Sequence, residues 1–372
     1  MKVLIRPARY DAIGGPIEEI LDSFSLRWKG ARVLVKPNVL GPWTADAGVT
    51  THPSVVAALV RALAARGVGK IMVGDNPGLR GYAENERCFR TCGLMEAAGG
   101  QYVNLGRSPV KVKFNSRYAS EVTVSKEVLD CDILVSVPKF KTHALTMLTG
   151  AVKNTYGYIV GAEKALLHAA ATSPERFGEV VADVYAVRPP DLSIMDAVVC
   201  MEGKGPSGGA LRQAGKLIAS DNAVCLDAVM CSMAGVAPEK IPTLRIAHAR
   251  GFGEIDLSKI EVDGPLEPIR DFSMPGTFTA GLFGYIIHRF VFPRLRTKPR
   301  FNMRTCTRCK ACYELCPVKA ISWDDGPVLK REKCISCFCC MESCPSNAVE
   351  LRGVLYKVRD ALTKRTAGGP CG

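Results

Sequence analysis

The chain has 372 residues and a formal net charge of +13, with 47% hydrophobic and 23% charged residues. This composition excludes an intrinsically disordered polymer, which would be less apolar, and a collagen, which would need glycine at every third position. No run of about 18 apolar residues lacks charges, so we expect no transmembrane helix, and the charged first residues predict no secretory signal.

The first 264 residues alternate between short apolar runs and amphipathic segments. The apolar runs predict buried strands, which lie at 31–37, 70–75, 132–138, 192–198 and 216–220. The amphipathic segments predict helices at 51–67, 84–98, 174–187 and 221–234. This alternation predicts an α/β domain over 1–264, with a mostly parallel sheet and flanking helices.

Ligands of open α/β sheets bind outside the carboxyl ends of the strands, so the residues that follow each predicted strand are the candidate site. The polar residues at these places predict an anion site made by Lys36, Asn38, Lys139, Lys141, Lys153, Asn154, Lys204 and Gly205. His52 and His143 are candidate proton donors, and the glycine-rich stretch 203–209 can offer backbone amides. We expect the helix starts near Thr51 and Asp221 at the same edge.

Other interpretations of these loops stay open. Loop lysines are often only solvated, and Asp75, Asp196, Asp221 and Asp227 are an alternative set of ligands for a divalent ion. The stretch 202–209 does not have the Walker A order, and no G-x-G-x-x-G follows a strand. The sequence therefore does not predict nicotinamide or flavin binding.

A proline-containing, apolar and basic linker is predicted at 265–300, and the last residues, 353–372, form a tail. The stretch 276–296 can lie in a membrane interface with its arginines towards lipid phosphates, or it can pack against protein. From Pro293 onwards the charge is 16 − 7 = +9. These basic residues surround a cysteine-rich module and no nucleic-acid-binding motif is present, so we do not expect nucleic acid as a partner.

Two cysteine runs dominate the predicted C-terminal domain, 301–352. Each has the spacing C-x2-C-x2-C-x3-C-P of bacterial ferredoxins, in which the fourth cysteine ligates the other cluster. We therefore predict two 4Fe-4S clusters in a small α+β ferredoxin-like domain, whereas zinc, which needs four ligands, fits eight regularly spaced cysteines poorly. The ligand sets are Cys306, Cys309, Cys312 and Cys344 for the first cluster and Cys334, Cys337, Cys340 and Cys316 for the second. A chain this long with these cysteines predicts a reducing, cytoplasmic location.

Five motifs of the large domain occur together: VKPN, THP, GDNPG, PKFKTHALTMLTGAVKNTYG and MDAVVCMEGKGPSGG. With the two-cluster module, they resemble the prokaryotic family catalogued as domain of unknown function 362. The resemblance spans about residues 1–265. It implies an iron–sulfur redox protein of anaerobic bacteria or archaea, and it supplies no reaction.

Three functions are consistent with these features. The first is an iron–sulfur oxidoreductase that passes low-potential electrons to or from an anionic small molecule or cofactor at the strand-end loops. The second is an electron-transfer subunit without chemistry of its own, which docks in a larger redox complex. The third is a factor that matures or assembles another enzyme's metallocofactor. All three predict a redox partner protein or complex, and the second and third leave the enzyme assignment open.

Overall fold

The computed structural model describes residues 1–78, 81, 84–143, 146–161, 163–171, 173–274, 298–314, 316, 318–334, 340, 344, 346 and 348–352. The chain divides into two compact units, Met1–Val160 with Lys164–Phe278 and Gly161–Glu163 with Thr279–Gly372. The predicted membrane-facing stretch 276–296 and the tail lie outside the described residues, and the predicted domain limits stay predictions. No described helix has the length and apolar character needed to cross a bilayer.

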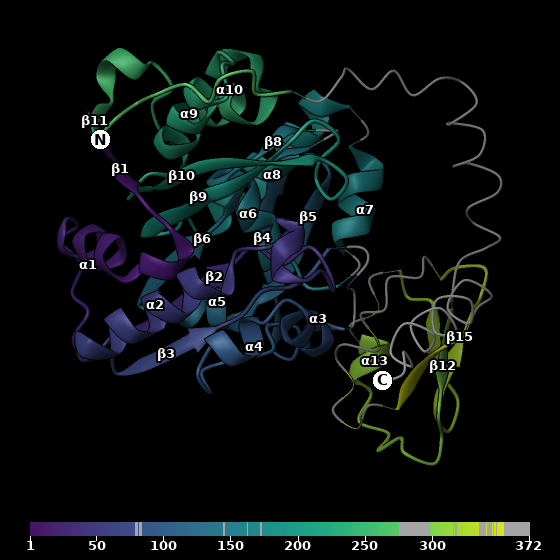
Figure 1. Cartoon of the computed structure of the whole chain (residues 1–372). Helices are drawn as coiled ribbons and strands as arrows, with labels where there is room; N and C mark the ends of the chain where they lie inside the picture. The colour runs from purple at the N-terminus through teal and green to yellow at the C-terminus, as the bar shows by residue number, and fades with distance from the viewer. Residues whose placement is uncertain are drawn as a thin grey trace, which may run out of the picture. The chain divides into compact units, whose positions relative to one another are not determined.

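A single sheet organises the large unit, with the order β11-β1-β10-β9-β6-β2-β3 and with β7 added beside β9 and β8 beside β7 (Figure 1). Its strands are β1 (Lys2–Pro7), β2 (Arg32–Pro37), β3 (Lys70–Val73), β6 (Ile133–Val137), β7 (Lys139–His143), β8 (Met147–Thr149), β9 (Leu192–Glu202), β10 (Ala210–Ser220) and β11 (Glu261–Asp263). Pairing is parallel except where β10 meets β1 and β9, and where β8 meets β7. The predicted mostly parallel sheet is therefore confirmed.

Successive side chains of the buried strands enter two different hydrophobic cores. In β2, Val33 and Val35 belong to one core and Leu34 to the other, as expected for a strand covered on both faces. One core packs against α1, α2 and α3, and the other against α6, α8, α9 and α10, which gives three layers (Figure 1). The longer helices are α1 (Gly14–Asp22), α2 (Pro53–Ala65), α3 (Asn85–Thr91), α7 (Glu163–Ala170), α8 (Pro174–Val187), α9 (Ala223–Met233) and α10 (Pro242–Ala249).

Short elements complete the unit. The hairpin of β4 (Pro109–Ser116) and β5 (Ala119–Ser125) forms a separate two-stranded sheet. Short helices connect the strands, namely α4 (Leu94–Ala97), α5 (Lys126–Asp130), α6 (Ala151–Asn154) and the 3-10 turns η1 (Tyr10–Ala12), η2 (Ala45–Ala47), η3 (Thr155–Tyr158), η4 (Pro238–Lys240) and η5 (Leu257–Lys259).

Two details differ from the sequence prediction. The helix predicted at 84–98 is two helices, because Gly93 adopts φ +75°, a left-handed conformation that ends α3. The strand predicted at 216–220 begins at Ala210 and is antiparallel to β9, with Ser220 opposite Ser193 near the start of β9. Asp221 therefore lies at the amino edge of the parallel strands, and the predicted common edge for the helix starts near Thr51 and Asp221 is wrong.

The second unit is small and consists of two similar strand pairs. β12 (Lys298–Phe301) pairs with β15 (Val349–Arg352), and β13 (Ile321–Trp323) pairs with β14 (Pro327–Leu329), both antiparallel. The short helix α13 (Ala311–Glu314) carries Cys312. A compact cluster of apolar side chains and cysteines forms its core.

Candidate functional site: a lysine-rich sheet edge and a cysteine module

A buried ion pair lies on one face of the sheet, where β2 and β3 end. Lys36 Nζ lies 2.7 Å from Asp75 Oδ1, and both side chains are buried. The amine also donates to Asn154 Oδ1 at 3.2 Å, and Asn38 Nδ2 donates to the same oxygen at 3.2 Å. Burial lowers the pKa of Lys36, and Asp75 opposes that effect. Lys36, Asn38 and Asn154 are brought together as predicted, and Asp75 already neutralises Lys36.

A second buried pair lies on the other face, where β7 runs beside β9. Lys139 Nζ lies 2.8 Å from Asp196 Oδ2 and donates to Tyr10 Oη at 2.9 Å, while Tyr10 donates to Asp196 Oδ1 at 3.0 Å. The Tyr10 ring stacks on His52, with centroids 3.6 Å apart. His52 Nδ1 accepts from Ser54 N at 3.2 Å, so the ring proton lies on Nε2. Burial lowers the pKa of His52, which keeps the ring neutral at pH 7.

Two further lysines have no such partner among the described residues. Lys141 Nζ is buried and donates to the carbonyl oxygen of Val49 at 2.6 Å, and Lys153 is half-buried on α6. Within the described ranges, neither amine has a carboxylate at ion-pair distance. Burial, with repulsion from Lys153 and Lys139, lowers the pKa of Lys141 well below its ordinary value. Burial and neighbouring lysines lower the pKa of Lys153 to about 8.

His143 belongs to the same electropositive region. Burial lowers the pKa of this imidazole well below its ordinary value, with further lowering by Lys153 and Lys141. Thr146 N donates to His143 Nδ1 at 3.3 Å, so Nε2 carries the proton. A neutral imidazole in this state donates a hydrogen bond through Nε2–H and does not carry a positive charge.

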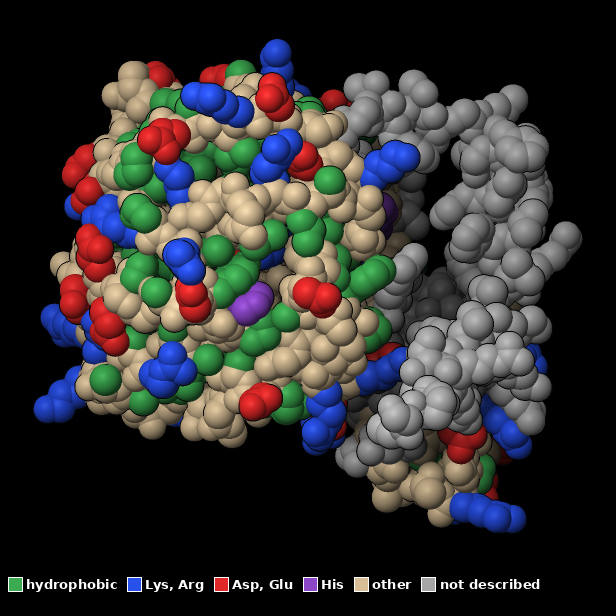
Figure 2. All heavy atoms as spheres, viewed as in Figure 1, with side chains coloured by type: hydrophobic (Ala, Val, Ile, Leu, Met, Phe, Trp, Pro, Cys, Tyr) green, Lys and Arg blue, Asp and Glu red, His purple; other side chains and the backbone are tan. Residues whose placement is uncertain are grey.

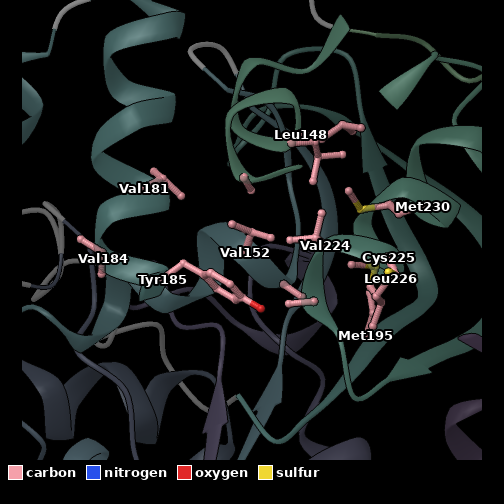
Figure 3. Packing of buried hydrophobic residues seen from close by; sticks show 14 of the residues in the cluster. Leu148, Val152, Val181, Val184, Tyr185, Met195, Val224, Cys225, Leu226 and Met230 are labelled. Atoms are coloured by element: carbon pink, nitrogen blue, oxygen red, sulfur yellow. The ribbon is translucent and has the colours of Figure 1, made fainter. Parts of the chain in front are cut away.

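Hydrogen bonds and packing hold α6, the helix that carries Lys153, in place. Asp227 on α9 accepts hydrogen bonds from Ala151 N at 2.6 Å and from Val152 N at 2.9 Å. Burial raises the pKa of Asp227 to about 7, and the two amides oppose that effect. Figure 3 shows Val152 between Tyr185 of α8 and Val224 of α9, within the larger core. The position of Lys153 is therefore set by a cap and by packing.

The remaining predicted residues do not share this environment. Lys204 is exposed on the loop between β9 and β10. Gly205 is buried, and a Cβ added there would lie 2.1 Å from the carbonyl oxygen of Thr142, so the loop packs closely on β7. The four aspartates of the alternative metal site do not meet, since Asp75, Asp196 and Asp227 have separate partners. In the described part of the chain, no three His, Cys, Asp or Glu side chains lie close enough to hold a single metal ion.

Two further polar side chains of these regions were not predicted. Tyr10 follows β1, whose apolar run KVLIRP has the same strand signal as the five predicted strands. Lys164 is buried on α7, where Nζ donates to the carbonyl oxygens of Asn76 at 2.6 Å and Pro77 at 3.1 Å. Its helix, α7, was not among the predicted helices, and Lys164 does not lie in a loop that directly follows a predicted strand.

Four cysteines of the second unit surround one pocket. Cys306, Cys309, Cys312 and Cys344 line it together with Trp323. Burial and the three neighbouring thiols raise the pKa of Cys312 to about 11. A thiol with a raised pKa becomes a thiolate ligand only beside a bound cation, and a cationic iron–sulfur core supplies that charge. The residues therefore fit the predicted first cluster.

The second ligand set is related to the first by a structural repeat. Equivalent cysteines of the two runs are 334 − 306 = 28 positions apart. The pairs Phe301–Val349 and Leu329–Ile321 are equivalent under this offset, as are the bonds Asn302 N to Ala348 O and Lys330 N to Ala320 O, both 2.7 Å. Cys344 and Cys316 also each accept from a backbone amide four residues later, at 3.1 Å. The two cysteine runs therefore lie in a duplicated fold, while Cys337 lies outside the described residues.

Comparison with known proteins agrees with this two-part organisation. Residues 33–232 match the family described as domain of unknown function (DUF362), and residues 298–345 match the 4Fe-4S dicluster domain. A thylakoid-associated protein of Synechocystis sp. is 34% identical over 231 residues, which are 60% of this chain and 68% of that protein.

Two solved structures are similar to part of the chain at low sequence identity. The lactate racemase apoprotein from Thermoanaerobacterium thermosaccharolyticum has 11% identity and a TM-score of 0.43, over 63% of this chain and 57% of that one. A Thermotoga maritima protein has 14% identity and a TM-score of 0.38, over 52% of this chain and 51% of that one. The chain thus spans little more than half of either structure. By its sequence match and its motifs, the chain belongs to the DUF362 family, and it carries a C-terminal 4Fe-4S dicluster domain.

Proposed function

We propose that this chain is an iron–sulfur oxidoreductase that holds an anionic small molecule or cofactor at Lys141, Lys153 and His143 and exchanges electrons with it. The observation that carries the proposal is the pair of amines without a carboxylate partner in the described structure. Two of the other candidate lysines, Lys36 and Lys139, each face an aspartate and serve to build the edge, while Lys204 is exposed on its loop.

Physical chemistry favours an anion at these amines. A buried ammonium without a counter-charge costs several kcal/mol, so Lys141 stays neutral until a negative charge arrives. An anion beside Lys141 and Lys153 raises the pKa of both amines, which draws a proton onto Lys141 and keeps Lys153 charged. The neutral His143 can then donate a hydrogen bond from Nε2 to the same anion. Binding of the anion therefore couples to proton uptake.

The cysteine module supplies the redox part of the proposal. The eight predicted ligands would hold two 4Fe-4S clusters, which provide one-electron transfer at low potential when bound. Backbone amides aimed at the sulfurs of Cys316 and Cys344 stabilise the thiolates. We also propose a reducing, cytoplasmic location, and contact of 276–296 with a membrane surface is supported by the thylakoid-associated relative.

Binding of inorganic phosphate, used as a probe anion, tests the site under anoxic conditions. Lys141→Ala removes one of the two unpaired amines and should weaken phosphate binding at least about tenfold, because it removes a charge-assisted hydrogen bond. Lys113→Ala, at an exposed position of β4, is the matched control and should bind phosphate like the native chain. Equal affinity of Lys141→Ala and the native chain, with unchanged iron content, would refute the anion site.

A further inference from the structure

The two halves of the cysteine module differ in charge around their ligands. With the 28-residue offset (334 − 306), each position in the first half has a counterpart in the second. Three cations of the first half, Arg304, Arg308 and Lys310, correspond to Glu332, Ser336 and Phe338. The second half has its own cations, Lys330, Arg331 and Lys333, before its first cysteine, so what is particular to the first half is the positive charge between the ligands, at Arg308 and Lys310.

The cations surround an exposed ligand. Cys309 is exposed, and its neighbours Arg308 and Lys310 are exposed as well. Both neighbours have left-handed backbone, with φ of 55° and 63°. This conformation strains a non-glycine residue, and glycine would avoid the strain. The chain keeps two long cationic side chains at strained positions beside the ligand that solvent reaches.

Apolar side chains lie next to these cations. Lys310 Nζ lies 5.6 Å from the ring centroid of Trp323, which packs edge-on against the exposed Tyr313 at 6.3 Å. The sulfur end of the exposed Met303 lies against Gly326, next to Asp325, which pairs with Arg308 at 3.2 Å. Cations beside a few exposed apolar groups are typical of small, transient protein interfaces steered by charge.

We propose that this surface (Met303, Arg304, Arg308, Lys310 and Tyr313 around Cys309) docks an acidic redox protein that exchanges electrons with the first cluster. The inference rests on the proposed function and names the partner class and the half of the module that it meets. One electron leaves the reduced acidic protein and arrives at the first cluster, so the partner is oxidised by one electron and no bond or proton is transferred. Opposite charges steer the encounter and lose strength as salt rises.

A carboxylate-terminated gold electrode serves as the probe, because it presents the negative charge of the expected partner. Voltammetry of the full chain with its clusters should give a fast exchange that slows with salt. Arg304→Glu with Lys310→Glu should slow the exchange at least about tenfold. Lys113→Glu with Lys240→Glu reverses two exposed lysines of the large unit and should leave the exchange unchanged. Iron content establishes that both double variants keep their clusters. If Arg304→Glu with Lys310→Glu loses its clusters, Arg304→Gln takes its place.

Three results would overturn the proposal. The first is an unchanged exchange rate in Arg304→Glu with Lys310→Glu, and the second is an equal loss in both double variants, which would reflect net charge alone. The third is that Arg304→Glu with Lys310→Glu no longer sediments with phosphatidylglycerol vesicles while its electrode exchange persists. That result would make the surface a membrane site. Phosphate binding at Lys141 is measured separately, so failure of this inference and failure of the proposed function are distinguishable.

Discussion

Replacing Lys153 by methionine should stabilise the large unit while it weakens anion binding. Methionine keeps most of the length and apolar character of the side chain and removes the amine, which has no carboxylate partner in the described structure. Functional sites commonly hold groups that the fold would be more stable without. Lys153→Met therefore separates the cost of the amine from the packing of α6.

The size of the effect follows from the pKa. The pKa of Lys153 falls from 10.5 to about 8 on folding, and each unit corresponds to about 1.4 kcal/mol. The difference of 10.5 − 8 = 2.5 units gives about 3.4 kcal/mol, and partial solvation of this half-buried side chain reduces it to about 2 kcal/mol.

The sign follows from proton linkage. Below pH 8 the folded chain carries the full penalty, because the amine is charged in both states and is desolvated only in the folded one. Between pH 8 and 10.5 the unfolded state binds the extra proton, so stability rises with pH. The methionine variant lacks this dependence, and its advantage over the native chain should shrink as the pH rises through that window.

Urea unfolding from pH 7 to 10 under anoxic conditions measures the difference between the two chains. The native-minus-variant difference isolates Lys153 from other groups that titrate in this range. Lys113→Met, at an exposed site of β4, is the control and should follow the native pH dependence. Native and Lys153→Met curves that run parallel from pH 7 to 10 would refute the claim that this amine is destabilising.

Three other substitutions test separate parts of the account. Asp227→Ala leaves the amides of Ala151 and Val152 without an acceptor and should lower the free energy of unfolding by about 2–4 kcal/mol in urea titrations. The control Asp221→Ala, at an exposed position, should cause almost no change, and equal effects of the two substitutions would contradict the cap. Gly157→Ala places a Cβ 2.3 Å from Asp75 Oδ1 and 2.6 Å from Lys36 Nζ, so it should cost about 3 kcal/mol or more by splitting the pair, whereas Gly14→Ala meets nothing within 4 Å and should be tolerated. Cys306→Ala and Cys334→Ala should each lower iron from about eight to about four atoms per chain, with Cys200→Ala as a buried control from the large unit; unchanged iron in either would contradict its ligand assignment.

The sequence predicted the sheet well because its buried strands are short, continuous apolar runs. The runs at 31–37 and 132–138 became β2 and β6, and α2 begins at Pro53 as its proline and preceding polar residues indicate. Strand direction was not predictable, because β10 is an apolar run like the others and only its hairpin connection to β9 makes it antiparallel. That single reversal moved Asp221 away from the site.

The candidate residues were predicted, whereas their roles were not. Alternation within β7 indicates that Lys139 and Lys141 share one face, yet nothing in the sequence reveals that Asp196, 57 positions from Lys139, neutralises only one of them. Such partners come from elements distant in the chain, as Asp75 does for Lys36. The cysteine spacing was more informative because its ligands are local and their chemistry is restricted. Figure 2 shows acidic and basic side chains interspersed on the visible face of the large unit. The distribution of charge on that face therefore does not indicate where the site lies.

Native mass spectrometry of the anoxically purified chain tests the central claim most directly, since it weighs metal and ligand together. The account predicts the polypeptide plus two 4Fe-4S clusters plus a retained anionic small molecule, and loss of that small molecule alone in Lys141→Met. A spectrum with fewer than two clusters, or with the same small molecule retained in Lys141→Met, would contradict it.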